Sequence, residues 1–359
     1  MSAPSSMCRA APAVTAQQLW FTQEQQVAIR EQVLPAPGAG EVLVRVCCSA
    51  ISAGTELLVY RGQLPEGMSL DSNLASLQGG TGFPLQYGYA CVGRVQQAGP
   101  DVDGSWMGRL VFAFQPHASH FVASAASLKP LPDDIEPEAG VFLPNMETAV
   151  NLVQDGSPGL GERVVVLGQG IVGLLLSSLL AQFPLQRLWA LDGIAARRSR
   201  ALQSGVHQVC DPGSATELAA LTQQLSAGEG ATGADLIYEV SGAPEALNLA
   251  VALSGYTSRI VIGSWYGIKT ATIALGGEAH RNRLSISTSQ VSTLAPQLRG
   301  RWDKVRRASQ VWDLIRCLQP QQLITHRVPF NEAGALYKLL HQAPDDVLQA
   351  LFVYPSGQD

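Results

Sequence analysis

Three glycines with a fixed spacing separate two apolar runs. Gly168, Gly170 and Gly173 follow "RVVVLG" (163–168), which has the pattern of a buried strand, and open "IVGLLLSSLLAQF" (171–183), which has that of a helix. In such a unit the first glycine permits the turn, the second lets a pyrophosphate approach the backbone, and the third lets the helix pack on the strand. The helix start also offers free N–H groups to phosphates. The predicted dinucleotide-binding loop is completed by Gln169, Ile171 and Val172.

A carboxylate stands where such a loop needs one. Asp192 ends the next predicted strand, "RLWALD" (187–192), 19 positions beyond Gly173. There it would accept hydrogen bonds from the ribose hydroxyls of the adenosine half. It would also repel a 2′-phosphate, so the sequence favours NAD(H) over NADP(H). The basic residues that could instead reach such a phosphate, and that keep NADP possible, are Arg197, Arg198 and Arg200.

The nicotinamide half of the cofactor should lie at the carboxyl ends of the central strands. Two runs, "ADLIYEVS" (234–241) and "RIVIGSW" (259–265), read as strands that end in small residues. These residues either contact the cofactor or form ordinary strand-to-helix turns. They are Ser241, Gly242, Gly263 and Ser264.

The order of predicted elements indicates an α/β protein with two domains. The first ~155 residues are strand-rich with frequent glycine and proline, and from about 160 strands alternate with helical runs, which is typical of a doubly wound parallel sheet. The tail mixes both types again, so the α/β part interrupts an outer domain. The expected domains are residues 1–157 with 293–359, and residues 158–292.

A second polar set lies outside the dinucleotide unit, at breaks in the strand-like runs. Gly54-Thr55-Glu56 forms a corner in "SAISAGTELLVYRG" (49–62), and Tyr89 lies in "YGYACVGRV". Hydroxyl, phenol, carboxylate and imidazole groups are the usual proton carriers of enzymes. The remaining candidates of this kind are His117 and His120 in "QPHASHF", and Glu147 in "NMETAV".

Over nearly its whole length the chain resembles the medium-chain dehydrogenase/reductase superfamily, the alcohol dehydrogenase-like enzymes. The resemblance rests on "PAPGAGEVLVRVCCSAISAGTELLVYRG", "YGYACVGRV", "LGQGIVG" and "LITHRVPFNEAGALYKLL". It implies a GroES-like catalytic domain interrupted by a Rossmann domain, with the active site in the cleft between them. The sequence segments around Thr55 and Tyr89 look most like those of the zinc-independent branch that contains bacteriochlorophyllide a dehydrogenase. Other segments look like a bacterial group often labelled zinc-binding alcohol dehydrogenases.

The chain departs from the zinc-dependent members at each ligand position. Where they usually carry Cys-Gly-Thr-Asp and Gly-His-Glu, this sequence has Ala53-Gly54-Thr55-Glu56 and Gly88-Tyr89-Ala90, and Pro144 aligns with the third ligand. Catalytic zinc needs three N, O or S ligands. The resemblance therefore implies an enzyme without zinc and without a metal site. His117 and His120, near Cys91, would face opposite sides of an extended segment, which disfavours chelation.

Without a metal, side chains must handle the proton that accompanies hydride transfer. The resemblance makes Thr55 a proton relay, and Tyr89 stands at the lost histidine as a donor. Glu56 and Glu147 are possible acids or bases, and His117 or His120 a proton shuttle. Structural roles stay open for each: a turn cap for Thr55, packing for Tyr89, an ion pair with Arg61 for Glu56, a helix start for Glu147, and a surface position for the histidines.

The expected function is NAD(H)-dependent interconversion of a secondary alcohol and a ketone, on a small or bulky biosynthetic intermediate. One alternative is reduction of an enone or quinone C=C bond by NAD(P)H. The other is a nucleotide-binding sensor without catalysis.

Composition excludes several other classes. The 359 residues carry a net charge of −5 and no long basic run, which argues against nucleic acid as a partner. The basic run "RWDKVRRASQ" (301–310) reads as a solvated helix face. No apolar stretch reaches membrane-spanning length, and the N-terminus lacks the pattern of a secretory signal. Six cysteines show no C-x-x-C spacing, so we expect a reduced, cytoplasmic protein that takes a small-molecule substrate and, as is common for this fold, forms a homodimer.

Overall fold

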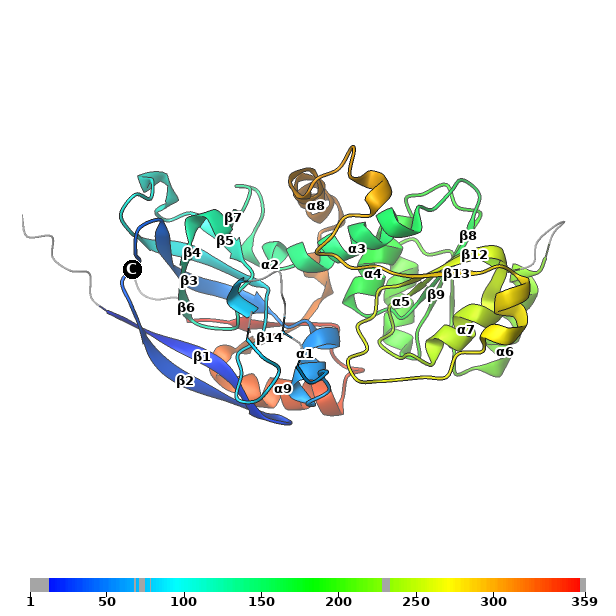
Figure 1. The fold of residues 1–359 in the computed structure, drawn as a ribbon, viewed down its shortest axis with the longest axis horizontal. Helices are drawn as coiled ribbons and strands as arrows, with labels where there is room; N and C mark the ends of the chain where they lie inside the picture. Colours follow the sequence, from blue (N-terminus) through cyan, green and yellow to red (C-terminus); the bar gives the residue numbers. More distant parts are fainter. Residues whose placement is uncertain (1–12, 68, 71–74, 78, 228–232, 356–359) are drawn as a thin grey trace, which may run out of the picture.

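Two large sheets divide the molecule, one mostly antiparallel and one parallel. The computed structural model describes residues 13–67, 69–70, 75–77, 79–227 and 233–355. Figure 1 shows the parallel sheet on the right, the antiparallel sheet on the left, and helices α1 (Ala53–Tyr60) and α3 (Leu143–Gly156) between them.

The parallel sheet has six strands in the order β10-β9-β8-β11-β12-β13, and every neighbouring pair is parallel. Its strands are β8 (Arg163–Leu167), β9 (Arg187–Leu191), β10 (Gln208–Cys210), β11 (Ala234–Glu239), β12 (Ser254–Ile262) and β13 (Ser285–Thr288). Between them run α4 (Ile171–Leu180), α5 (Ala195–Gln203), α6 (Ala215–Leu225) and α7 (Ala246–Leu253). Val164, Val165 and Val166 of β8 are completely buried, as a strand covered on both faces requires. The doubly wound arrangement expected from the sequence is confirmed.

The second sheet is built from both ends of the chain. Its order is β14-β15-β3-β4-β5-β7, with β6 also paired to β3. The strands are β3 (Glu41–Ala50), β4 (Cys91–Ala98), β5 (Leu110–Ala113), β6 (His120–Ser124), β7 (Lys129–Pro130), β14 (Ile324–Pro329) and β15 (Gln349–Val353). Because β15 pairs with β3 (Phe352 opposite Ser49), the parallel sheet interrupts a GroES-like unit. The predicted fold class is therefore confirmed.

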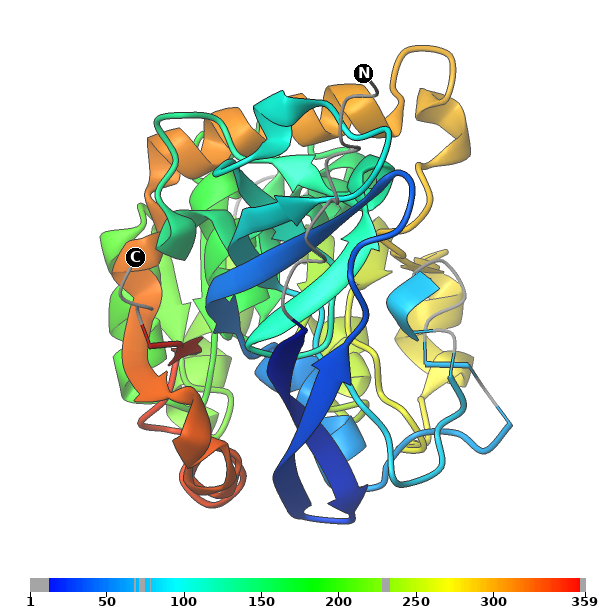
Figure 2. The ribbon, with the colours of Figure 1, turned by 90° about the vertical axis from the view of Figure 1, so that its left-hand side faces the viewer.

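Helices and a hairpin complete the molecule. The hairpin joins β1 (Val14–Gln23) to β2 (Gln26–Leu34), and α9 (Ala333–Gln342) packs beside it, as Figure 2 shows. Helix α2 (Pro137–Gly140) leads into α3, and α3 packs on both α4 and α8 (Lys304–Leu318). No helix among the described residues is both long and apolar enough to cross a membrane.

The corner expected at residues 54–56 is the first turn of a helix, α1. The four residues that follow are all buried: Leu57, Leu58, Val59 and Tyr60. They pack into a cluster that also contains Tyr337 of α9 and Phe352 of β15. Because four consecutive residues span a full helical turn, α1 is buried on all sides over this stretch.

The basic run at 301–310 is not a fully solvated face, because Arg307 of α8 is only 3% exposed. Its Nη1 donates to Asn151 Oδ1 at 2.9 Å, and its Nη2 donates to the carbonyl of Val291 at 2.7 Å. Its Nε lies 3.9 Å from Glu147 Oε1. The guanidinium thus joins α8 to α3, and the expectation of solvation was wrong for this residue.

Candidate active site

The turn between β8 and α4 has the geometry that a pyrophosphate needs. Gly168 has φ +95° and lies so close to the next strand end that a Cβ would approach Ser241 Cα to 2.5 Å. At Gly173 a Cβ would come within 2.0 Å of the Gly168 carbonyl oxygen. A Cβ at Gly170, the N-cap of α4, would meet nothing within 4 Å. The turn is therefore tight on its protein side and open at the helix start, and it fits a dinucleotide.

Asp192 holds this turn in place. Its Oδ2 accepts the N–H of Gln169 at 2.7 Å, and its Oδ1 accepts the N–H of Ile194 at 2.8 Å. The residue is 8% exposed. Each carboxylate oxygen has a second lone pair, so ribose hydroxyls can still be accepted. The carboxylate therefore links the glycine turn to the end of β9.

The arginines near Asp192 are already engaged. Arg198 Nη1 donates to the Asp192 carbonyl oxygen at 2.7 Å and lies 3.1 Å from Asp211 Oδ2. Arg197 Nη2 donates to the carbonyl of Pro344 at 3.0 Å, and its Nη1 lies 3.9 Å from Asp192 Oδ2. Binding a 2′-phosphate with either arginine would require breaking these contacts.

The strand ends predicted for the nicotinamide half are brought together. The N–H of Gly242 donates to Ser264 Oγ at 2.9 Å, and the Ser241 hydroxyl donates to Glu239. Gly263 lies against α3, where a Cβ would approach Leu152 Cδ2 to 2.8 Å.

Two residues at this edge escaped the sequence analysis. Glu239, at the end of β11, is completely buried. It accepts the N–H of Ser241 at 2.8 Å and the hydroxyl of Tyr266 at 2.5 Å. Burial and the bond to Glu239 hold the pKa of Tyr266 well above its usual range. The only sequence signal was that Glu239 lies two positions before Ser241, a predicted cofactor contact.

The loop after β12 reaches the other half of the molecule. Lys269 Nζ donates to the Gly242 carbonyl at 2.8 Å, while the N–H of Ile268 donates to the Gln63 carbonyl at 3.1 Å, just beyond α1. A Cβ at Gly267, whose φ is +62°, would lie 2.2 Å from that carbonyl oxygen. This loop therefore places the carboxyl edge of the parallel sheet directly against the segment that follows α1.

Three hydroxyl groups meet at the start of α1. Tyr89 donates to Ser52 Oγ at 2.5 Å and lies 3.4 Å from Thr55 Oγ1. All three residues are half-buried. Thr55 and Tyr89 were predicted to share a site, and the structure brings them together. Ser52 was missed because it precedes the motif that the resemblance aligned.

Glu56 is not at an accessible position, and it does not pair with Arg61. It is completely buried: His117 Nε2 lies 3.0 Å from its Oε2, Tyr337 donates to the same oxygen, and the N–H of Ser52 donates to Oε1 at 2.7 Å. Arg61 instead donates to His341 Nδ1 at 3.0 Å.

The network continues beyond His117, which is also completely buried. Its Nδ1 lies 2.7 Å from Ser49 Oγ, which in turn lies 2.8 Å from the Tyr354 hydroxyl. Gly88 makes room for the ring, since a Cβ there would lie 2.6 Å from His117 Cδ2. Burial, followed by the charge and hydrogen bond of Glu56, holds the pKa of Tyr337 well above its usual range.

The other two candidates lie elsewhere. His120 is half-buried on β6, with its Nδ1 3.1 Å from Ser119 Oγ, and burial lowers its pKa. Glu147 is buried on α3 and faces Arg307. Neither has a hydrogen bond to the hydroxyl group cluster among the contacts of the described residues. Their catalytic roles remain predictions without geometric support.

The residues at the expected zinc position do not fit zinc. Ala53 has no donor atom, Tyr89 offers a phenol that is bonded to Ser52, and Pro144 has no side-chain donor. Nowhere in the described ranges do three His, Cys, Asp or Glu residues gather closely enough to hold a metal ion. Cys91 is buried, and its thiol faces the Gln115 carbonyl at 3.2 Å.

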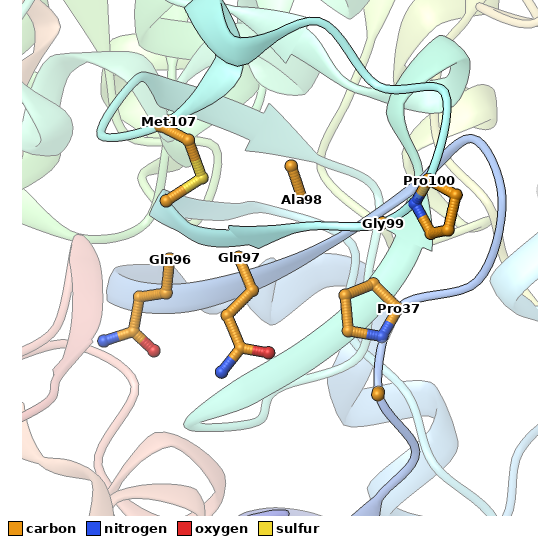
Figure 3. A pocket seen from close by; sticks show the side chains of 8 residues that line it. Pro37, Gln96, Gln97, Ala98, Gly99, Pro100 and Met107 are labelled. Atoms are coloured by element: carbon orange, nitrogen blue, oxygen red, sulfur yellow. The ribbon is translucent and has the colours of Figure 1, made fainter. Parts of the chain in front are cut away.

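A surface depression of about 620 Å³ lies away from these groups (Figure 3). Its lining includes Pro37, Gln96, Gly99 and Met107. Because β3 and β4 are antiparallel, this depression is at the opposite end of the two strands from the start of α1.

Comparison with known proteins agrees with this architecture. No family model matches the sequence. D-guloside 3-dehydrogenase of Escherichia coli is 26% identical over 326 residues, which cover 87% of this chain and 92% of that protein. 2-Desacetyl-2-hydroxyethyl bacteriochlorophyllide A dehydrogenase of Rhodobacter capsulatus is 26% identical over 327 residues, covering 87% and 90%.

The fold is also similar to that of solved structures. A protein described as the short chain alcohol dehydrogenase RspB of Escherichia coli, in complex with NADH, superposes with a TM-score of 0.74 at 20% identity, covering 94% of this chain and 99% of that one. Three observations point to the same kind of protein: the interrupted sheet, the glycine turn with Asp192, and the dehydrogenase relatives. The chain is similar over most of its length to dehydrogenases of the medium-chain alcohol dehydrogenase type, and these similarities indicate an NAD(P)-dependent oxidoreductase.

Proposed function

We propose that the protein interconverts a secondary alcohol and a ketone with NAD(H) and without zinc. The observation that carries this proposal is the group of hydroxyls formed by Ser52, Thr55 and Tyr89. It occupies the segments that provide metal ligands in the zinc-dependent members of the superfamily. A hydroxyl cluster can donate a proton to a ketone oxygen, or accept one from an alcohol, which is the task left when a Lewis acid is absent.

The burial of each side chain indicates its role in the proposed reaction. The cofactor, when bound, supplies or accepts the hydride. The glycine turn and the N-terminus of α4 hold its phosphates, and Asp192 holds a ribose. The half-buried hydroxyls near α1 are the groups that can reach a substrate oxygen. Glu56 and His117, completely buried, hold the start of α1 in place and take no part in proton transfer to the substrate.

The substrate class is suggested by the relatives. Those described above act, by their names, on a guloside and on a hydroxyethyl bacteriochlorophyllide. Both are bulky molecules with hydroxyl groups attached to larger rings. We propose a hydroxylated, ring-containing small molecule as the substrate, with neither nucleic acid nor membrane as a partner.

The test is a substrate panel. We expect methyl glycosides, cyclic polyols or aryl alkyl carbinols, offered with NAD⁺, to produce a rise in nicotinamide absorbance, and the matching ketones to consume NADH. Elemental analysis of the same preparation, after mild chelation, should show no stoichiometric zinc while turnover persists. Turnover of 2-cyclohexenone or benzoquinone alone would support C=C reduction instead. A full equivalent of retained zinc would refute the metal-free mechanism.

Cofactor preference gives a second test. Replacing Asp192 with alanine removes a charged acceptor for the ribose hydroxyls, so the Kd for NADH should rise about 10- to 100-fold. The Kd for NADPH should change much less, because the repulsion of its phosphate disappears as well. Titration of nicotinamide fluorescence measures both values. Asp211→Asn, which keeps Asp192 intact, is the control, and an unchanged ratio of the two Kd values would contradict the ribose assignment.

We also propose the wider organisation expected from the sequence. Residues 1–157 with 293–359 would form the catalytic domain and residues 158–292 the cofactor domain. The cysteines in the described part of the chain are free thiols, which supports a reducing cytoplasmic environment. A homodimer is proposed by analogy with the fold alone, and sedimentation would decide it.

A further inference from the structure

Ser52 is an N-cap serine that does not cap its helix. A serine at the N-cap normally accepts an N–H from the second or third helical residue. Ser214, the N-cap of α6, does so by accepting the N–H of Glu217 at 3.3 Å. Ser52 occupies the same position on α1, yet its side chain makes no capping bond.

Glu56 stabilises the start of α1 in its place. Its Oε1 accepts the backbone N–H of Ser52 at 2.7 Å, and its Oε2 is held by His117 and Tyr337. Because the side chains of Glu56, His117 and Tyr337 are all buried, they fix the backbone at Ser52 from inside the molecule. The hydroxyl of Ser52 is therefore relieved of the capping role and held in one position.

The Ser52 hydroxyl is left with a proton to donate. Its Oγ accepts the Tyr89 hydroxyl at 2.5 Å, so the phenol proton is directed at Ser52. Within the described ranges, none of the hydrogen bonds has Ser52 Oγ as its donor, and the residue is half-buried rather than enclosed. A half-exposed hydroxyl that is fixed, accepts from a phenol and retains its own O–H has the properties of a proton donor to a ligand.

We propose that Ser52 is the catalytic residue that contacts the substrate oxygen, with Tyr89 behind it as the source of the proton. This assignment deepens the proposed alcohol–ketone function and rests on it. In reduction, the carbonyl carbon gains the hydride and the C=O π pair moves onto oxygen. That oxygen takes the Ser52 proton while Ser52 takes the Tyr89 proton, and the Tyr89 phenolate regains a proton from water. Oxidation follows the same steps in reverse.

The test compares two N-cap serines. Ser52→Ala should lower kcat about 10²-fold on the best alcohol of the panel, as expected for loss of one oriented donor. Its Kd for NADH should stay within twofold of wild type, because the glycine turn is untouched. Ser214→Ala should do the opposite: kcat unchanged, and a melting temperature lower by about 1–3 °C through loss of a cap. Ser52→Thr, which keeps the hydroxyl, should restore most of the kcat.

Tyr89→Phe and the double variant complete the experiment. If the two hydroxyls act as one chain, Ser52→Ala with Tyr89→Phe should lose no more than about threefold beyond the worse single variant, as for groups acting as a unit. Two results would overturn the role of Ser52 and leave the proposed function standing. In the first, the fold-losses in kcat of the two single variants multiply in the double variant. In the second, Ser52→Ala keeps the wild-type kcat while Tyr89→Phe is impaired. If the wild type turns over no alcohol or ketone, the proposed function fails first, and this assignment falls with it.

Discussion

Gly173→Ala should abolish measurable NADH binding. The added Cβ would lie 2.0 Å from the Gly168 carbonyl oxygen and 2.9 Å from its carbonyl carbon, and both are backbone atoms that cannot rotate away. Helix α4 must then move off the turn that holds the pyrophosphate. We expect the Kd for NADH to rise at least about 100-fold, and the free energy of unfolding to fall by about 1–3 kcal/mol from overpacking. Fluorescence titration and denaturant unfolding measure these two quantities.

Two other glycines provide matched controls for this prediction. At Gly170 a Cβ meets nothing within 4 Å, so Gly170→Ala should keep wild-type stability and weaken NADH binding only by filling the approach of the phosphates. Gly334 of α9 is equally open and exposed, and its replacement by alanine should stabilise the protein by about 0.4–1 kcal/mol with unchanged binding. A Gly173→Ala protein that binds NADH as the wild type does would show that the turn is not the cofactor site.

Glu56→Ala should cost about 3–5 kcal/mol of unfolding free energy, because a buried donor left unsatisfied costs about 1–3 kcal/mol and several donors lose their acceptor at once. The substitution leaves the completely buried His117 and Tyr337, and the Ser52 N–H, without their shared acceptor. Glu56→Gln retains the acceptor for Ser52 and should lose less. Urea unfolding of the two variants, beside Glu66→Ala as an exposed carboxylate control, gives the comparison.

The same variants separate a structural role from a catalytic one. If Glu56 is structural, the folded fraction of Glu56→Gln should bind NADH as the wild type does and keep most of its kcat. A variant of undiminished stability whose kcat falls about a thousandfold would instead make Glu56 an acid–base group in the reaction. Its complete burial argues for the first result.

The glycine turn and its carboxylate partner could be predicted from the sequence because these residues lie close together along the chain. Gly168, Gly170 and Gly173 lie within six positions, and Asp192 follows at the end of the next strand. The glycines are required by backbone geometry, which side-chain packing elsewhere cannot replace. The alternating strands and helices around them follow from hydrophobic patterning, so the fold class was accessible as well.

The rest of the site depends on contacts between distant segments. Glu56 meets His117 61 positions away and Tyr337 281 positions away, and no periodicity links such pairs. The sequence therefore suggested Arg61 as the partner of Glu56, on proximity alone. Arg307 was missed for the same reason, because its burial depends on how α8 packs against α3. Ser52 could be recognised as a candidate site residue only from the structure, which shows that its side chain makes no capping hydrogen bond.

The contact between the loop after β12 and the end of α1 has a consequence for how specificity can change. The spacing of the two halves is set there by main-chain atoms: the N–H of Ile268 on the Gln63 carbonyl, with Gly267 admitting no side chain between them. Exchange of side chains around Ser52 and Tyr89 leaves this spacing unaltered. Side chains at this site can therefore be exchanged without altering the main-chain contact that sets the separation of the two halves.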